Sequence, residues 1–133
     1  AVTASYAPAT GKDVDDKNAV DEGGNNILDD DGNQVIIEGL KTILKNEIKA
    51  QAKSYLSSSD WYVIRKAEDA ESTIPSNIAT YRAAVRTRSN EMETQIDGAA
   101  DAAAMESLYT YTNTGTEESP EYTRPLGEWP KLS

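Results

Sequence analysis

The chain has 133 residues, a formal net charge of −10, and neither cysteine nor histidine. This length suffices for one small domain, and the missing side chains exclude disulfides, thiolate nucleophiles, imidazole bases and the usual zinc sites. The acidic balance argues against nucleic acid or an anionic membrane surface as the main partner, and no apolar run approaches the ~18 residues of a membrane span.

Residues 1–34 predict an acidic, extended arm. Eight acidic residues stand here against two lysines, and so polar a segment cannot offset the entropy of its own ordering. The first residue is Ala, which is compatible with removal of an initiator Met, and no secretory signal is visible. An Asp-Gly pair between Ile27-Leu28 and Val35-Ile36 predicts a short hairpin. No internal repeat is apparent.

Residues 35–57 predict the first helix. Its apolar residues recur at spacings of three and four: Ile36, Leu40, Ile43, Leu44, Ile48, Ala52, Tyr55 and Leu56. A basic stripe recurs every four residues: Lys41, Lys45, Lys49 and Lys53. The stripe is either a solvated face or a docking surface for acidic groups, on a partner or on this chain's own arm.

Two further helices, about 60–69 and 77–96, flank a hinge at 70–75. One of the serines at 57–59 is expected to cap the second helix, with Asp60 in its first turn. Pro75 disfavours helix at the preceding residue, and Ser76 is expected to cap the third helix.

The aromatic residues predict where the core lies. Trp61 and Tyr81 are expected to pack against each other across the hinge, with Tyr55 and Leu56 as a third wall, which places the hydrophobic centre within 57–86. The predicted core comprises Leu40, Leu44, Ile48, Leu56, Trp61, Ile64, Tyr81 and Val85.

Gly98 separates a fourth predicted helix, about 99–109, from the third. Residues 110–133 are rich in Pro, Gly, Thr, Ser and Glu and predict an extended tail with at most a short strand. The fold class expected is a mainly α, small helical bundle at 35–109, between an acidic arm at 1–34 and a tail at 110–133.

No catalytic or cofactor-binding motif occurs, so the sequence indicates a non-enzymatic protein without a cofactor. The Asp-rich loop can be aligned with a calcium-binding EF-hand loop, which puts Asp29, Asp31 and Glu38 at ligand positions around Gly32. The first ligand position is then Ile27, which cannot bind calcium, so an acidic turn is favoured and no metal site is predicted.

Arg82 and Arg86 lie four residues apart on the third predicted helix. Their stems either cover the apolar groove while their heads pair with nearby carboxylates, or they grip an acidic segment of a partner. Tyr6, Tyr122 and Trp129 are the apolar anchors available in the arm and the tail. These five residues form the predicted partner-binding set.

The order of several short elements resembles the bacteriophage tail assembly chaperone family and the related C-terminal regions of phage tail-fibre proteins. The elements are "AKSYLSSSDW", "YVIRKAE", a spacer with Pro, "TYRAAVR" and "LGEWPKLS". The positions that carry the resemblance are Leu56, Ser59, Asp60, Trp61, Tyr81, Arg82, Val85, Arg86, Trp129 and Pro130. They cover residues 50–90 well, the last few residues weakly, and the arm not at all.

The resemblance implies a virion protein of a tailed phage, associated with the tail or fibre and without enzymatic activity. Its partners would be phage tail, fibre or capsid subunits, with several copies in a larger assembly and no contact with nucleic acid or membrane. The arm and tail would become ordered on neighbouring subunits. Two alternatives remain open: a tail-fibre assembly chaperone that stays in the host cytoplasm, and a capsid decoration protein.

Overall fold

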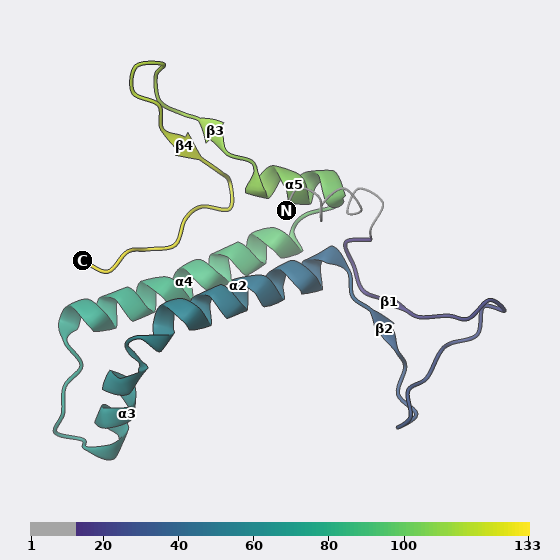
Figure 1. The fold of residues 1–133 in the computed structure, drawn as a ribbon, viewed down its shortest axis with the longest axis horizontal. Helices are drawn as coiled ribbons and strands as arrows, with labels where there is room; N and C mark the ends of the chain where they lie inside the picture. Colours follow the sequence, from purple (N-terminus) through teal and green to yellow (C-terminus); the bar gives the residue numbers. More distant parts are fainter. Residues whose placement is uncertain (1–12) are drawn as a thin grey trace.

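A long antiparallel helix pair forms the body of the molecule (Figure 1). The computed structural model describes residues 13–133. In chain order its elements are β1 (Lys17–Asn18), β2 (Ile36–Ile37), α2 (Leu40–Ser57), α3 (Asp60–Glu68), α4 (Ser76–Asp97), α5 (Ala102–Tyr109), β3 (Thr112–Asn113) and β4 (Tyr122–Thr123). The described chain is mainly helical, which confirms the mainly α class, and it has two short antiparallel strand pairs, β1–β2 and β3–β4, where at most one short hairpin was predicted.

The helix boundaries differ from those predicted where another element competes for the same residues. The first helix begins at Leu40 rather than 35, because Ile36 and Ile37 pair with β1 as strand β2. Helix α4 already includes Ser76, so Pro75 rather than Ser76 is its N-cap residue. At α5 the Asp101 carboxylate accepts the backbone N–H of Ala104 at 2.8 Å, an N-cap that the sequence analysis did not single out.

The main hydrophobic core lies between α2, α4 and α5. It comprises Leu40, Leu44, Ile48, Met92, Ile96, Ala99, Met105 and Leu126. Helix α2 runs antiparallel to α4, and Lys45–Asp97 and Lys49–Glu93 ion pairs at 2.8 and 3.5 Å flank the contact. Burial of these apolar side chains, each removing area from water, is the main stabilising contribution to the helix pair.

The prediction that the hydrophobic centre lies within 57–86 is wrong. Leu40, Leu44, Ile48 and Val85 of the predicted core are buried, and Leu56 and Tyr81 are half-buried. Trp61 and Ile64, however, are 50% and 58% exposed. Trp61 stacks on its neighbour Tyr62, with ring centroids 3.9 Å apart, instead of crossing the hinge to Tyr81.

The C-terminal segment packs on the helices of its own chain rather than extending away as a free tail. Leu126 is fully buried, and its N–H donates to the carbonyl of Leu108 at 3.0 Å. Trp129 packs against the core, lies 5.3 Å from the ring of Tyr55, and donates its indole N–H to Gln51 at 2.9 Å. The β3–β4 hairpin projects from this segment (Figure 1). The burial of Leu126 and the packing of Trp129 therefore hold this segment on the helices despite its polar composition.

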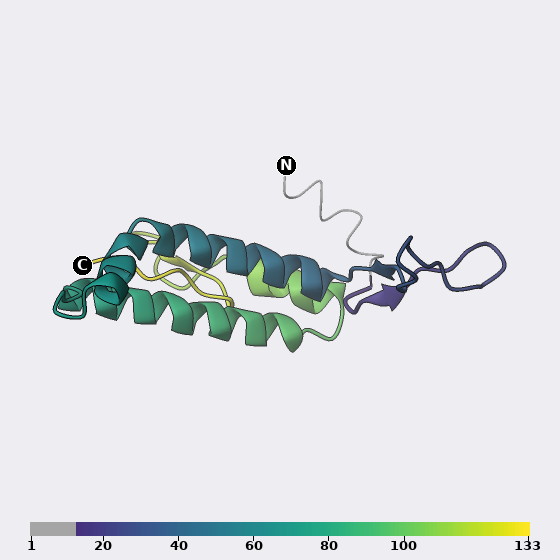
Figure 2. The ribbon, with the colours of Figure 1, turned by 90° about the horizontal axis from the view of Figure 1, so that it is seen from below.

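The described part of the N-terminal segment, residues 13–39, is folded as well. Its backbone carbonyls at Asp13 and Val14 accept the N–H groups of Leu40 and Lys41, both at 3.0 Å, which satisfies free donors at the start of α2. Gly39 allows this crossing, because a Cβ there would overlap the backbone of Asp15. Beyond it lies a small β unit at the end of the rod opposite α3 (Figures 1 and 2).

Candidate partner-binding site

A clamp holds the junction between α2 and α3 against α4. The Arg82 guanidinium donates through Nη1 to the Leu56 carbonyl at 2.9 Å and to Ser59 Oγ at 2.8 Å. Its Nη2 donates to Asp60 Oδ1 at 2.9 Å. Ser59 is buried and the Arg82 side chain is 12% exposed, so the bonds to Ser59 and to the Leu56 carbonyl are largely shielded from water, whereas the Asp60 side chain is 50% exposed.

The clamp explains why the chain turns sharply at Ser59. The Ser59 hydroxyl donates to the Leu56 carbonyl at 3.2 Å instead of capping α3, and it accepts from Arg82. Asp60 sits in the first turn of α3, as predicted, where its charge suits the helix dipole. Leu56, Ser59, Asp60 and Arg82, four of the positions that carry the family resemblance, are thus brought together to fix the direction of α3.

The helix positioned by this clamp buries none of its own residues. At 100° per residue, Val63, Ala67, Ile64 and Trp61 fall on one arc of about 160°. Val63 is 40%, Trp61 50% and Ile64 58% exposed, and Ala67 is exposed as well. We call these four residues the α3 surface. Such a stripe normally faces a core, whereas here it faces solvent.

The α3 surface is held in a defined shape. The Arg65 guanidinium lies 4.8 Å from the centre of the Trp61 ring, a cation–π contact. After the helix, the Asp69 carboxylate accepts the N–H of Glu71 and the hydroxyl of Ser72, both at 3.1 Å. The loop that returns to α4 is therefore tied down, and the exposed stripe is presented by a preorganised element.

The predicted partner-binding residues do not gather in one place. Tyr6 lies outside the described residues. Arg82 forms the clamp with Asp60, and Trp129 hydrogen-bonds to Gln51 of the same chain. Arg86 is exposed and makes no ion pair with any described residue, and Tyr122 is 63% exposed on β4. Of the two interpretations of Arg82, the structure shows the first: its guanidinium pairs with a carboxylate of the same chain, Asp60.

The basic stripe of α2 is mostly paired within the chain. Lys41 lies 3.2 Å from Asp15 of the N-terminal segment, so this lysine does meet the chain's own arm. Lys45 and Lys49 pair with α4, and the hydrogen bond that Lys45 donates to Asp97 is the main cause that raises the pKa of Lys45. Lys53 is exposed and forms no ion pair among residues 13–133.

In the Asp-rich turn, the carboxylate of Asp29 accepts hydrogen bonds from the backbone of the turn itself. Asp29 Oδ1 accepts the N–H groups of Asp31 and Asn33, both at 2.9 Å, so this oxygen closes the turn. Within the described residues, His, Cys, Asp and Glu side chains nowhere form a cluster of three that could hold a metal ion.

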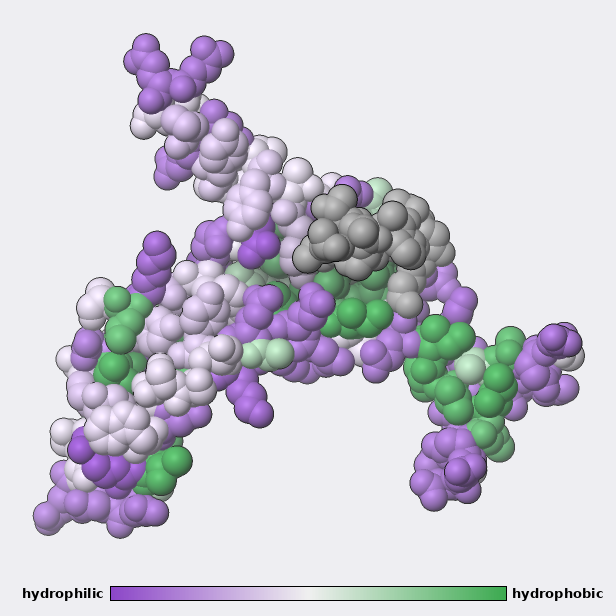
Figure 3. Space-filling view, viewed as in Figure 1, coloured by the Kyte–Doolittle hydropathy of each residue, from purple (hydrophilic) through white to green (hydrophobic). Residues whose placement is uncertain are grey.

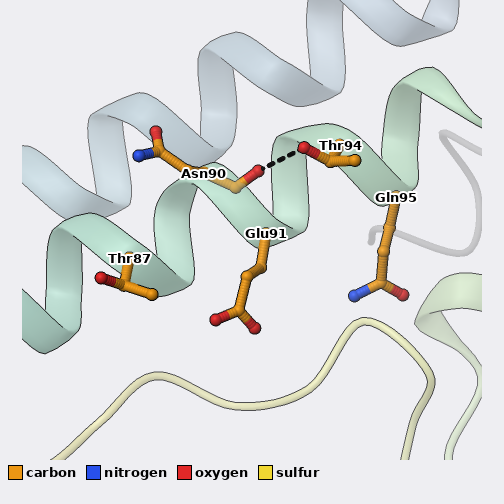
Figure 4. A pocket seen from close by; sticks show the side chains of 5 residues that line it. All are labelled: Thr87, Asn90, Glu91, Thr94 and Gln95. Atoms are coloured by element: carbon orange, nitrogen blue, oxygen red, sulfur yellow. Dashed lines mark hydrogen bonds between the residues drawn. The ribbon is translucent and has the colours of Figure 1, made fainter.

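A shallow groove of about 470 Å³ lies on α4. It is lined by Thr87, Asn90, Glu91, Thr94 and Gln95, which project from one side of the helix (Figure 4). The Thr94 hydroxyl donates to the Asn90 carbonyl at 2.9 Å. The lining holds a single carboxylate and no nucleophile with an adjacent base, so it offers no arrangement for acid–base or covalent catalysis.

Comparisons with known proteins identify no relative: no protein-family model, no curated protein and no solved structure matches the chain. Among residues 13–133, no helix combines the length and the apolar character needed to cross a membrane.

Two residues of the α3 surface, Trp61 and Ile64, were predicted from the sequence to lie in the core. They are three residues apart and belong to the apolar stripe of that helix. The side on which that stripe would lie depends on the clamp, because Arg82 and Ser59 decide how α3 leaves the end of α2. The composition of α3 was a further indication that it does not form the core, because four of its nine residues are charged and little apolar area is left.

Proposed function

We propose that this protein is a non-enzymatic structural subunit of a tailed bacteriophage particle, associated with the tail or fibre. It binds a neighbouring subunit through the α3 surface. The single observation that carries the binding role is a helix with no buried residue that exposes a continuous apolar stripe. Apolar patches of this kind on a polar chain mark interaction sites.

The chemistry of the stripe suits a helix-in-groove contact. Trp61 supplies a large amphipathic ring, and tryptophan and arginine are the side chains most enriched among residues that dominate binding energy. Ile64 follows Trp61 by three residues and Ala67 follows Val63 by four. These spacings match the i, i+3, i+4 pattern of helices that lie in hydrophobic grooves. Because the clamp fixes α3 in advance, little ordering entropy opposes binding.

The phage context rests on the resemblance carried by the Ser59-Asp60-Trp61 and Tyr81-Arg82 elements. The geometry gives these elements separate roles that support one function. Ser59, Asp60 and Arg82 orient the helix, and Trp61 is presented to solvent. A motif that both builds and exposes a binding helix is what an assembly protein requires.

The experiment supplies variants from a plasmid during particle production and measures their copy number in purified particles by quantitative mass spectrometry. Wild type is expected at a few to tens of copies, which would place it in the tail, collar or fibre. The double variant Trp61→Ser, Ile64→Ser is expected to fold but to fall at least tenfold in particles.

A matched control is Leu132→Ser, which changes an apolar side chain of similar exposure, 52%, outside the α3 surface. This variant should incorporate at the wild-type level. Hundreds of copies would instead favour capsid decoration. Protein abundant in the lysate but missing from particles would favour the assembly chaperone. Equal incorporation of the double variant would show that α3 is not the binding element.

A further inference from the structure

The β unit at the other end of the rod is built on an approximate threefold arrangement. Its centre is a ring of three hydrogen bonds, each of 2.9 Å: Ala19 N–H to Val35 O, Ile27 N–H to Ala19 O, and Val35 N–H to Ile27 O. The three residues are spaced eight apart in the sequence. Each segment therefore pairs with both of the others, and we call residues 17–37 the β-triangle.

The pairs around the ring obey the same eight-residue step. Val20 opposes Asn26, Leu28 opposes Gln34, and Ile36 opposes Asn18. Adding eight to each residue of the first pair gives the second pair. A further step gives Ile36 and position 42, and Asn18 takes the place of position 42 because it lies 24 residues, or three repeats, earlier in the chain. The sequence contains this repeat as "DVDDKNAV", "DEGGNNIL" and "DDDGNQVI", residues 13–36, so the expectation of no internal repeat is wrong.

Two corners of the triangle are nearly identical turns. In one, Asp21 Oδ1 accepts the N–H groups of Gly23 and Asn25, both at 2.9 Å, and Gly24 has φ +81°. In the other, Asp29 Oδ1 accepts from Asp31 and Asn33 at the same distance, and Gly32 has φ +85°. At the third corner the chain enters and leaves toward the helices.

One face of the β-triangle carries the last residue of each repeat, which is apolar in all three: Val20, Leu28 and Ile36. Successive side chains of a strand alternate between faces, and paired residues share a face. Val20, Leu28 and Ile36 therefore lie on one face together with their pairing partners Asn26, Gln34 and Asn18. The three apolar residues are 52%, 58% and 46% exposed. Figure 3 shows hydrophobic side chains gathered over this unit.

Gln34 marks the middle of that face. Its Nε2 lies 3.1, 3.1 and 2.8 Å from the carbonyl oxygens of Ala19, Ile27 and Val35. An atom so close to all three ring carbonyls sits near the centre of the ring. The three apolar side chains are thus distributed around a central polar side chain, and one chain presents three similar contacts about one axis.

The charge of the unit argues against a second copy of the chain as its occupant. Residues 17–37 carry Asp21, Glu22, Asp29, Asp30 and Asp31 against Lys17, a net charge of −4. Two such faces brought together would place like charges side by side, which is unfavourable. A partner with basic residues around an apolar patch is complementary.

We propose that this face docks on the end of a homotrimeric protein, along its threefold axis. Each subunit of the trimer would contribute the same apolar contact to one of Val20, Leu28 and Ile36, with basic side chains near the acidic turns. A closed cyclic trimer has three identical patches about its axis. A single chain with an approximately threefold face can contact all three patches in a similar way. The proposal does not depend on the α3 surface.

The test uses the absence of cysteine in the natural chain, which allows a single thiol at any chosen position. Val20→Cys, Leu28→Cys and Ile36→Cys are made in the full chain, and each thiol is labelled with benzophenone maleimide. Each labelled protein is irradiated in an extract of the cells that produce it, and crosslinked peptides are identified by mass spectrometry. Lys53→Cys, exposed on α2, is the matched control, and circular dichroism checks each variant's fold.

The expected result is that all three positions crosslink to one and the same peptide of one partner protein, at least tenfold above the control position. Three different peptides would mean an asymmetric partner and would overturn the proposal. Crosslinks to another copy of this chain would assign the face to self-association, and crosslinks no stronger than the control would mean that nothing docks there; either result overturns it. The crosslinking test does not involve the α3 surface, so its outcomes can be interpreted even if the proposed role of that surface is wrong.

Discussion

At the scale of single residues, the two tryptophans have opposite environments. Trp129 packs against the core and the ring of Tyr55, whereas Trp61 is half exposed and touches mainly Tyr62 and Arg65. Sequence reasoning placed Trp61 inside the molecule and Trp129 on a partner. The structure reverses both expectations, because burial is decided by the elements that a ring meets in space.

We expect Trp129→Ala to lower the free energy of unfolding by about 2 kcal/mol, since it removes a half-buried ring and leaves a gap beside the core. Trp61→Ala should change it by less than about 0.5 kcal/mol, as is usual for surface substitutions. Urea denaturation followed by circular dichroism measures both. The assignment of Trp61 to a binding surface would be undermined if the two variants were equally destabilised.

The Arg82 clamp supplies a second test at this scale. Arg82→Ala should destabilise the protein by about 2 kcal/mol, because three hydrogen bonds from a charged donor are lost and the buried Ser59 hydroxyl loses the donor that it accepts from. Arg86→Ala, at an exposed position on the same helix without an ion pair among residues 13–133, is the control and should be nearly neutral. Similar effects in both variants would contradict the clamp.

At the scale of elements, short polar segments of this chain are ordered by turns and caps rather than by large apolar area. Asp21, Asp29 and Asp101 each accept backbone N–H groups at the start of a turn or helix. These side-chain acceptors compensate for donors that a strand or helix end leaves free. Such local chemistry makes a unit as small as the β-triangle compatible with an acidic composition.

Gly32→Ala tests the turn geometry. Gly32 has φ +85°, in the left-handed region, and no atom lies within 4 Å of a Cβ built there. The alanine would therefore meet no clash, but its backbone strain should lower the free energy of unfolding by about 1 kcal/mol. Hydrogen exchange at the amides of Asp31 and Asn33 should accelerate. Gly98→Ala is the matched control: its φ is −80° and its contacts are ordinary, so it should be neutral or slightly stabilising. Unchanged exchange in Gly32→Ala would argue against this turn.

At the scale of the whole molecule, a helical rod separates two exposed apolar surfaces. The α3 surface lies at one end and the β-triangle at the other (Figure 1). Each is positioned by contacts within the chain, the first by Arg82 and the second by the crossing of residues 13–16 over Gly39. This arrangement suits a protein that links two different neighbours in an assembly.

The crossing at Gly39 predicts an acid-sensitive N-terminal unit. The Thr42 hydroxyl and, next, the Gly39 N–H bond to Asp16 and lower the pKa of its carboxyl. Because the folded pKa lies below the value of about 3.9 in an unfolded chain, the stabilisation is present above pH 4. It is lost as the pH falls through the folded pKa.

Hydrogen exchange at Leu40 and Lys41, measured between pH 6 and pH 2.5 and corrected for intrinsic rates, should therefore show loss of protection only at the acidic end. Asp16→Asn should flatten this pH dependence. Asp30→Asn, at an exposed turn residue, should leave it as in the wild type. Identical profiles in Asp16→Asn and wild type would remove Asp16 from this role.

The sequence by itself determined the mainly helical class, the approximate position of each described helix and the Asp-Gly turn before Val35. These depend on local periodicity and local hydrogen bonding, which adjacent residues specify. The repeat that forms the β-triangle was also present in the sequence, but apart from the initial Asp no position is identical in all three copies.

Only the tertiary structure decided which apolar stripe is buried. Leu126 and Met105 complete a core with α2 and α4, so the C-terminal segment folds back on the helices, while the equally regular stripe of α3 remains exposed. The outcome depends on contacts between residues far apart in the chain, such as Arg82 with Ser59 and Trp129 with Gln51. Periodicity shows that a helix has an apolar face, and the surrounding elements decide whether that face meets the core or is left for a partner.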